Sequence, residues 1–259
     1  MSDGVLFARD GAIATVTLNK PERLNALDKG MWRALGEIFR DLDRDESLRC
    51  VVLRGAGDRA FAAGADIAEF ATERANVEQA REYDRVVHPV LEAIARCRHP
   101  VVAMIRGACV GGGLEVAAVC DLRICGESSR FGIPVKNLGL VVAYGELQGL
   151  IDLVGRAAAL EIVLEGRVFG AQEAKDKGLV NRVVPDDKVE EETAAMVRRI
   201  AEGAPLVARW HKRFARRLAD PRPLTLEEYD ESFACFGTED YRIGYRAFLA
   251  KGKPDFRGK

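Results

Sequence analysis

The sequence predicts an α/β fold built from stacked β-β-α units, with a helical appendage at the C-terminal end. Two short apolar runs, residues 50–53 and 101–105, each end in Arg-Gly-Ala and lead through a glycine-rich loop to a helical pattern. This alternation favours stacked β-β-α units over an antiparallel sandwich. A further observation is the last part of the chain, which is charged, helical in pattern and rich in aromatic residues.

The composition is that of a globular protein with one main core. Of the 259 residues, 48% are hydrophobic and 31% are charged, which is typical of folded domains. The 39 basic and 40 acidic residues give a formal net charge of -1. The chain as a whole therefore lacks the electric field that would gather nucleic acid or an anionic membrane, and any anion must bind through a local group of residues.

The six cysteines are predicted to be buried free thiols, because they form no Cys-x-x-Cys pair and four of them lie in apolar runs. We expect no metal site. The first nine residues contain Asp3 and lack a basic segment followed by an apolar stretch of signal length. No segment reaches the roughly 18 apolar residues of a membrane span. These features predict a cytoplasmic protein without a membrane partner.

The chain is expected to open with a β-hairpin and a helix. Residues 5–8 and 12–18 are β-rich and flank an Asp-Gly pair, whose glycine supplies the positive φ of a tight turn. Apolar residues then recur at three- and four-residue spacing: Leu24, Leu27, Met31, Leu35, Ile38 and Leu42. This spacing predicts an amphipathic helix, with Asp28 as a candidate cap for its start. Another helix is predicted over residues 76–95.

The C-terminal part is predicted to be helical. Beyond Pro185 the sequence is charged and has helical patterns over residues 188–201 and 205–218. We therefore divide the chain into a core, residues 1–200, and a helical oligomerisation region, residues 201–259. The last segment carries aromatic residues that need another surface to be buried: Phe233, Phe236, Tyr241, Tyr245 and Phe248. A neighbouring subunit would provide that surface.

Two glycine-containing loops offer backbone N–H groups to a ligand. Residues 61–67, Phe-Ala-Ala-Gly-Ala-Asp-Ile, follow the first buried strand, and residues 110–115, Val-Gly-Gly-Gly-Leu-Glu, follow the second. The second loop opens a helix, whose first turn presents unpaired N–H donors at the positive end of the helix dipole. One N–H from each loop would stabilise the oxyanion of a thioester enolate. On their own, the glycines are better explained by a tight turn and close packing than by ligand binding.

Glu115 changes that balance, because it lies one helical turn beyond Gly112 in an otherwise apolar stretch. Desolvation disfavours the charged form of a carboxylate in such surroundings and makes it easier to protonate near neutral pH. A group of this kind is suited to general acid or base catalysis. Glu115 is therefore the candidate proton-transfer residue.

Together these loops resemble those of the crotonase (enoyl-CoA hydratase/isomerase) superfamily. The resemblance also covers the strand-loop-helix order between the loops, Cys-Asp-Leu at 120–122 and Phe-Gly-Ile-Pro at 131–134, and it runs from the hairpin to Phe256. It implies a crotonase-like spiral that binds an acyl-CoA thioester, with no cofactor beyond the CoA of the substrate. It also implies a homotrimer or a dimer of trimers, held partly by the C-terminal helices.

The resemblance also implies roles for individual residues. The N–H groups of Ala65 and Gly112 would form the oxyanion hole, and Glu115 would be one of the two catalytic glutamates of the hydratases. Arg23, in the early Lys-Pro-Glu-Arg-Leu-Asn-Ala-Leu segment, would meet a CoA phosphate. The backbones of four small or loop residues would hold the adenine end: Ala26, Ala63, Asp66 and Ile67. Further candidate contacts to CoA or substrate are Val110, Pro134 and Val135.

One position departs from the family. The hydratases have a second glutamate after the proline of the segment at residues 131–139, and this chain has Val135 there. A single carboxylate would then have to activate water and also handle the proton at the α-carbon of the substrate. Tyr144 and Glu146 are auxiliary candidates for the missing group, if their segment turns inward.

Hydration of a 2-enoyl-CoA is the leading hypothesis, and several alternatives stay open. Isomerisation, decarboxylation and thioester hydrolysis use the same oxyanion hole with different acid and base groups. A second class comprises a non-catalytic acyl-CoA-binding protein, or one that uses the basic helix at residues 209–217 on nucleic acid. Glu115 and the intact loops argue against mere binding, and the balanced charge argues against nucleic acid. The acyl specificity depends on the segments at residues 68–90 and 136–150.

Overall fold

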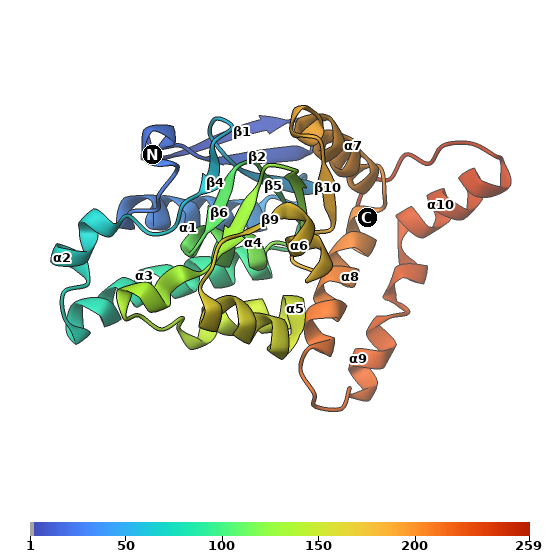
Figure 1. The fold of residues 1–259 in the computed structure, drawn as a ribbon. Coiled ribbons are helices and arrows are strands. Elements are labelled where there is room, and N and C mark those ends of the chain that lie inside the picture. Colours follow the sequence, from blue (N-terminus) through green and yellow to red (C-terminus); the bar gives the residue numbers. More distant parts are fainter. Residues whose placement is uncertain (1–2) are drawn as a thin grey trace.

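The strands form two sheets (Figure 1) in the computed structural model, which describes residues 3–259. The larger sheet has the order β1 (Val5–Asp10), β2 (Ile13–Leu18), β3 (Cys50–Gly55), β5 (Val101–Ile105), β7 (Leu122–Gly126) and β10 (Arg182–Val184). The smaller sheet has the order β4 (Ala60–Ala62), β6 (Ala108–Val110), β8 (Arg130–Gly132) and β9 (Phe169–Gly170). β1 and β2 form the predicted hairpin, with Gly11 at φ 55° in its turn.

Successive stretches of chain repeat one pattern: a strand in the larger sheet, a strand in the smaller sheet, then a helix. β3 is followed by β4 and α3 (Val77–Arg96), β5 by β6 and α4 (Gly112–Ala118), and β7 by β8 and the 3-10 helix η3 (Pro134–Leu138). Strands from successive turns pair in parallel in both sheets. The predicted stack of β-β-α units is confirmed. β3 and β5 are buried along nearly their whole length, which explains their continuous apolar sequences.

The glycines of the two Arg-Gly-Ala repeats lie where two backbone segments are in direct contact. A Cβ atom at Gly107 would lie 1.9 Å from the carbonyl oxygen of Arg59, and one at Gly55 would lie 2.2 Å from that of Ala60. Both obstacles are backbone atoms of a close-packed interior, which cannot swing aside as a side chain can. The Ala108 N–H donates to the same Arg59 carbonyl, at 3.0 Å. Gly107 is in direct contact with the backbone of the preceding turn, whereas Gly55 is in contact with the start of β4 in its own turn, and neither position leaves room for a side chain.

α1 (Lys29–Arg44) begins later than the apolar periodicity predicts. Asp28 caps it through its side chain, as expected. Leu24 and Leu27 lie before the helix, so the predicted helical placement of these two residues is wrong. The reason is a competing backbone interaction, since the Leu27 N–H donates to the Gly64 carbonyl at 2.8 Å.

Helices cover both faces of the larger sheet. α1, α3 and α4 belong to the main core, which includes Val51 and Leu53 of β3. α7 (Val189–Ala201) covers the other face, where Val52 and Val102 belong to a separate apolar cluster. The predicted helices at residues 76–95 and 188–201 are confirmed. The remaining helices of the body are α2 (Phe70–Glu73), α5 (Tyr144–Glu165), α6 (Ala171–Asp176) and the 3-10 helices η1 (Pro21–Arg23), η2 (Ile67–Glu69) and η4 (Asp186–Lys188).

The C-terminal helices extend to one side of the body (Figure 1): α8 (Pro205–Leu218), α9 (Leu226–Glu231), η5 (Ala234–Gly237) and α10 (Glu239–Leu249). The ion pair of Lys212 with Asp121, at 2.7 Å, ties α8 to the core. The aromatic residues expected to need another surface are exposed: Phe233, Phe236, Tyr241, Tyr245 and Phe248. Their partner, and the division of the chain at residue 200, stay predictions.

The cysteines are free, as predicted, and five of the six are buried. Desolvation raises the pKa of Cys50, Cys120 and Cys125 to about 12, so these thiols stay protonated at neutral pH. Within residues 3–259, no group of three or more His, Cys, Asp or Glu side chains is arranged to hold a metal ion. No helix in the same residues is long and apolar enough to cross a membrane.

Replacing Gly107 by alanine is expected to cost more stability than replacing Gly11. Both glycines have a positive φ, at 61° and 55°, so both substitutions carry the strain of a left-handed alanine, about 1–2 kcal/mol. Only Gly107 has backbone in the way of a Cβ, and overpacking adds about 1–3 kcal/mol. Urea unfolding of the two variants measures the difference in free energy. Equal losses would contradict the contact between turns.

Candidate active site

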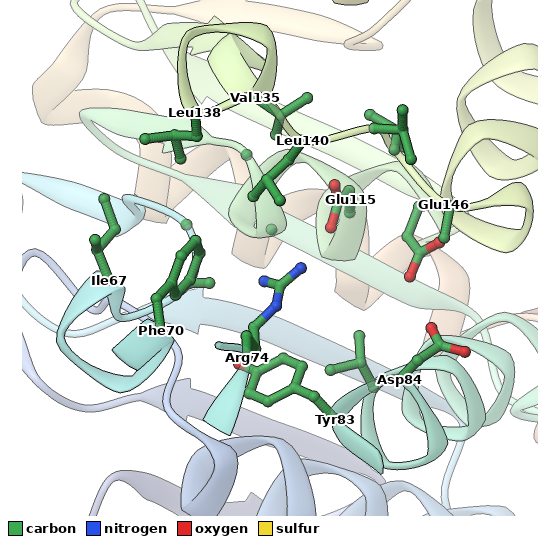
Figure 2. Close-up of a pocket in the computed structure, with 18 of the residues that line it drawn as sticks. Ile67, Phe70, Arg74, Tyr83, Asp84, Glu115, Val135, Leu138, Leu140 and Glu146 are labelled. Atoms are coloured by element: carbon green, nitrogen blue, oxygen red, sulfur yellow. The ribbon is translucent and has the colours of Figure 1, made fainter. Parts of the chain in front are cut away.

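The loops after β4 and β6, together with α3, η3 and the start of α5, enclose a cavity of about 190 Å³ (Figure 2). Each loop follows a strand of the smaller sheet, and β4 and β6 are parallel neighbours, so both loops leave the same edge of the sheet. The residues that they contribute to the lining are Ala63, Gly64, Ala65, Val110, Gly111 and Gly112. The two loops singled out in the sequence therefore meet at one cavity.

The N–H groups of Ala65 and Gly112 lie close together at this cavity. A Cβ atom on Gly112 would be 3.6 Å from the Ala65 nitrogen, and one on Gly64 would be 3.7 Å from the Gly112 nitrogen. Gly112 is the first residue of α4, where an N–H group has no partner within the helix. In the described part of the chain, neither N–H has a hydrogen-bond acceptor. Two unpaired donors therefore adjoin at one surface.

The Glu115 carboxyl group enters the cavity from α4 (Figure 2). Desolvation, followed by repulsion from Glu146, raises the pKa of Glu115 to about 7, while Arg74 acts in the opposite direction. The residue keeps partial exposure through the cavity, which leaves access for water or a substrate. A carboxyl group with a pKa near 7 can both give and take a proton at neutral pH.

Glu146 faces the same cavity from α5, whereas Tyr144 does not. Glu146 is 8% exposed, and its Oε2 atom has no hydrogen-bond partner among residues 3–259. Tyr144 is 96% exposed, so the expectation that it serves the site is corrected. The two residues lie two positions apart at the start of a helix, where a turn of about 100° per residue places their side chains on opposite sides.

Val135 lines the cavity without offering an acid or a base. It lies in η3 next to Pro134, and the wall around it is apolar, with Leu138, Leu140, Val141 and Val142. The cavity nevertheless holds a second carboxyl group, since Glu146 approaches it from the next helix (Figure 2).

The candidate CoA contacts divide between the cavity and its edge. The residues that line the cavity are Ala63, Ile67, Val110, Pro134 and Val135, and those that lie outside the lining are Arg23, Ala26 and Asp66. Arg23 Nη1 contacts Asp66 Oδ2 at 2.6 Å, and the arginine side chain is 58% exposed. The N–H groups of Ala63 and Asp66 donate to the carbonyls of Leu24 and Leu27. These two N–H groups are therefore already used, and a ligand at this edge must bind to other backbone atoms of Ala63 and Asp66, such as their carbonyl oxygens.

Sequence reasoning missed the residues of the wall that faces Val135 (Figure 2). Figure 2 shows Phe70, Arg74, Tyr83 and Asp84 on this wall, and the missed lining residues also include Trp32, Ala80 and Val87. The centre of the Arg74 guanidinium lies 4.7 Å from the centre of the Phe70 ring and 4.9 Å from that of Tyr83. None of these residues belongs to a glycine loop. The only sequence signal for most of them was the expected influence of residues 68–90 on acyl specificity.

The sequence profile of the family described as Enoyl-CoA hydratase/isomerase matches residues 8–259. This chain belongs to that family. The match confirms the crotonase resemblance, and the structural neighbours of the chain confirm the crotonase-like fold.

Relatives match the enoyl-CoA hydratase/isomerase chain over nearly its whole length. A short-chain-enoyl-CoA hydratase from Clostridium acetobutylicum is 31% identical over 97% of this chain and 96% of its own. A crotonyl-CoA hydratase from Syntrophomonas wolfei is 31% identical over 99% of each chain. The crystal structure of an enoyl-CoA hydratase/carnithine racemase from Magnetospirillum magneticum has a TM-score of 0.98 and 51% identity, covering 100% of this chain and 97% of that chain.

Glu115→Gln is expected to stabilise the protein increasingly as the pH rises from 5 to 8. An ordinary glutamate loses its proton near pH 4.5 and folded Glu115 near pH 7, so between these values only the folded state holds the proton. Raising the pH through this window therefore lowers the free energy of unfolding of the wild type, by about 1–3 kcal/mol. Glutamine does not titrate, so the Glu115→Gln variant does not show this loss. Urea unfolding at pH 5 and pH 8 measures the trend.

The exposed Glu37, replaced by glutamine, is the matched control for this titration. Its difference from the wild type should stay nearly constant over the same pH range. If Glu115→Gln also differs from the wild type by a constant free energy, Glu115 does not have a raised pKa.

Proposed function

We propose that this member of the family hydrates a 2-enoyl-CoA, with Glu115 and Glu146 as its acid and base groups. The observation that carries the proposal is the meeting of these two carboxyl groups in one cavity, beside the N–H groups of Ala65 and Gly112. The hydratase names of the relatives support the same reaction.

The paired N–H groups would act on the thioester. As water adds to the β-carbon, the electrons of the double bond move toward the thioester, and its carbonyl oxygen becomes an enolate oxyanion. The donors of Ala65 and Gly112 adjoin and have no other acceptor in the described chain, so both are available to this oxygen. The glycine loops hold them in position before the substrate binds, and the charge that develops in the transition state is then stabilised without reorganisation.

The two carboxyl groups would divide the proton transfers. One of them, ionised, accepts a proton from the water as the water oxygen bonds to the β-carbon. The other, protonated, gives its proton to the α-carbon as the enolate returns to the thioester, so the substrate gains one water and the pair keeps one proton. Repulsion between the two groups favours this singly protonated state, in accord with the raised pKa of Glu115. Glu146 thus supplies the group that Val135 lacks.

The CoA portion would lie along the edge of the cavity. Arg23 is the candidate for a CoA phosphate, because its guanidinium is exposed there and binds phosphate oxygens well. The backbones of the neighbouring loops would hold the adenine end, at Ala26, Ala63, Asp66 and Ile67. Ile67 extends this edge with an exposed apolar side chain.

We also propose that the protein is a homotrimer or a dimer of trimers in the cytoplasm. The exposed aromatic residues of the C-terminal helices support an interface, since Phe248 alone is 83% exposed. The free cysteines support a reducing compartment.

Replacing Glu146 by glutamine is expected to lower kcat for crotonyl-CoA hydration by a factor of about 10² to 10⁴, because glutamine keeps the shape of the side chain and removes proton transfer. Glu115→Gln should have an effect of the same order. Both variants should still bind the CoA thioester, which thermal unfolding with and without ligand checks. Mass spectrometry of the 3-hydroxyacyl product measures turnover.

The control for this pair is Tyr144→Phe, which should leave turnover unchanged because Tyr144 is exposed outside the cavity. Unchanged hydration in Glu146→Gln would remove Glu146 from the mechanism. A panel of enoyl-, malonyl- and hydroxyacyl-CoA thioesters extends the test. A shifted double bond, loss of CO₂ or release of free CoA in place of hydration would instead identify an isomerase, a decarboxylase or a hydrolase.

A further inference from the structure

Arg74 brings a cation without an ion pair into the cavity. Its side chain points into the cavity from the wall that faces Val135 (Figure 2), and the guanidinium rests against the rings of Phe70 and Tyr83. In residues 3–259, no carboxylate oxygen lies within 4.0 Å of its nitrogens, and the side chain donates no hydrogen bond. The two rings hold the cation in place without using its N–H donors.

Two neutral donors also line the cavity. The ring of Trp32 would lie 3.6 Å from a Cβ atom on Gly112, and its buried indole N–H has no acceptor in the described chain. Desolvation, followed by the charge of Glu69, raises the pKa of Tyr83 to about 12, so the hydroxyl keeps its proton at neutral pH. The Trp32 N–H acts to lower that pKa but does not reach the hydroxyl in hydrogen-bond geometry. Within residues 3–259, Arg74, Trp32 and Tyr83 thus form a set of donors without an acceptor.

The carboxylates of the cavity leave this set available. Arg74 lowers the pKa of Glu115, but this effect is smaller than those of desolvation and Glu146, which raise it. Neither Glu146 nor the exposed Asp84 forms an ion pair with Arg74 among the described residues. A guanidinium partly withdrawn from water, with its donors unpaired, is stabilised when an anion binds to it.

We propose that the acyl chain of the substrate ends in a carboxylate, which Arg74 binds, with the Trp32 and Tyr83 donors beside it. This inference rests on the proposed function, since it names the class of acyl group that the same cavity takes. The planar guanidinium fits a carboxylate through two parallel hydrogen bonds. A hydrocarbon chain would leave these donors without acceptors, and a site built in this way discriminates against the ligand that lacks the polar group.

Two other uses of Arg74 predict different results. If Arg74 serves only to adjust Glu115, its removal changes the pH profile of turnover and leaves the preference among acyl groups unchanged. If Arg74 binds a CoA phosphate, its removal weakens every CoA thioester equally.

The test compares glutaryl-CoA, whose acyl chain ends in a carboxylate, with hexanoyl-CoA, whose chain is neutral. Both are saturated, so neither can be hydrated, and isothermal titration calorimetry reports binding independently of catalysis. The wild type should bind glutaryl-CoA about tenfold or more tightly than hexanoyl-CoA. Arg74→Met should weaken glutaryl-CoA binding by about 10- to 100-fold, as expected for the loss of a hydrogen-bonded charge, and change hexanoyl-CoA binding by less than about twofold.

Two further variants make the result specific. Arg74→Lys, which keeps the charge, should retain part of the preference for glutaryl-CoA, and it provides a second reading if the methionine variant is unstable. Arg81→Met removes an exposed arginine of α3 that forms no ion pair in the described chain, and it should bind both thioesters as the wild type does.

The inference is overturned if the wild type binds the two thioesters equally, or if Arg74→Met weakens both to the same extent. It is also overturned if the methionine variant keeps the preference and only the pH profile of turnover shifts. Hydration of crotonyl-CoA and of 4-carboxybut-2-enoyl-CoA, measured on the wild type, separates the two proposals. A preference for glutaryl-CoA without any hydration would contradict the proposed function and leave the inference standing. Hydration without that preference would contradict the inference and leave the proposed function standing.

Discussion

Backbone contact between successive turns of the spiral decides where the other parts of the cavity lie. A Cβ atom at Gly113 would be 2.2 Å from the Ala62 carbonyl oxygen, so α4 starts directly against the strand of the preceding turn. This contact brings the N–H of Gly112 beside that of Ala65. It also sets the rotation of α4, which turns the carboxyl group of Glu115 into the cavity. The absence of side chains at a few positions is thus the condition for the whole arrangement.

Most of the fold could be predicted because its signals are local. The buried strands are continuous apolar runs, the cap of α1 is the single side chain of Asp28, and an Arg-Gly-Ala sequence follows the buried strand in each of two successive units. The start of α1 could not be predicted in the same way. Leu27 is fully buried, but by pairing with the loop at Gly64, and the spacing of apolar residues does not reveal which partner buries a leucine.

The residues of the candidate site also differ in whether a local sequence signal or a contact with a distant segment places them. Glu115 could be identified because its position follows from the loop just before it. The choice between Tyr144 and Glu146 depended on the rotation of α5, which is set by packing against distant parts of the chain. Arg74 was missed because its neighbours, the rings of Phe70 and Tyr83, come together only when α2 and α3 fold over the cavity. Contacts between segments of this kind leave no pattern in a single sequence.

Glu115 and Glu146 stand on parts of the molecule that differ in their tolerance of mutation. α4 begins inside the contact between turns, where an inserted residue or a bulkier side chain would displace backbone. α5 lies outside the repeating units, and a single insertion or deletion ahead of it would rotate Glu146 away and present a different side chain to the cavity, with the paired N–H groups left intact. The fold therefore tolerates changes at the position of Glu146 and few changes at that of Glu115. A descendant of this protein could acquire a new reaction without changes to its core.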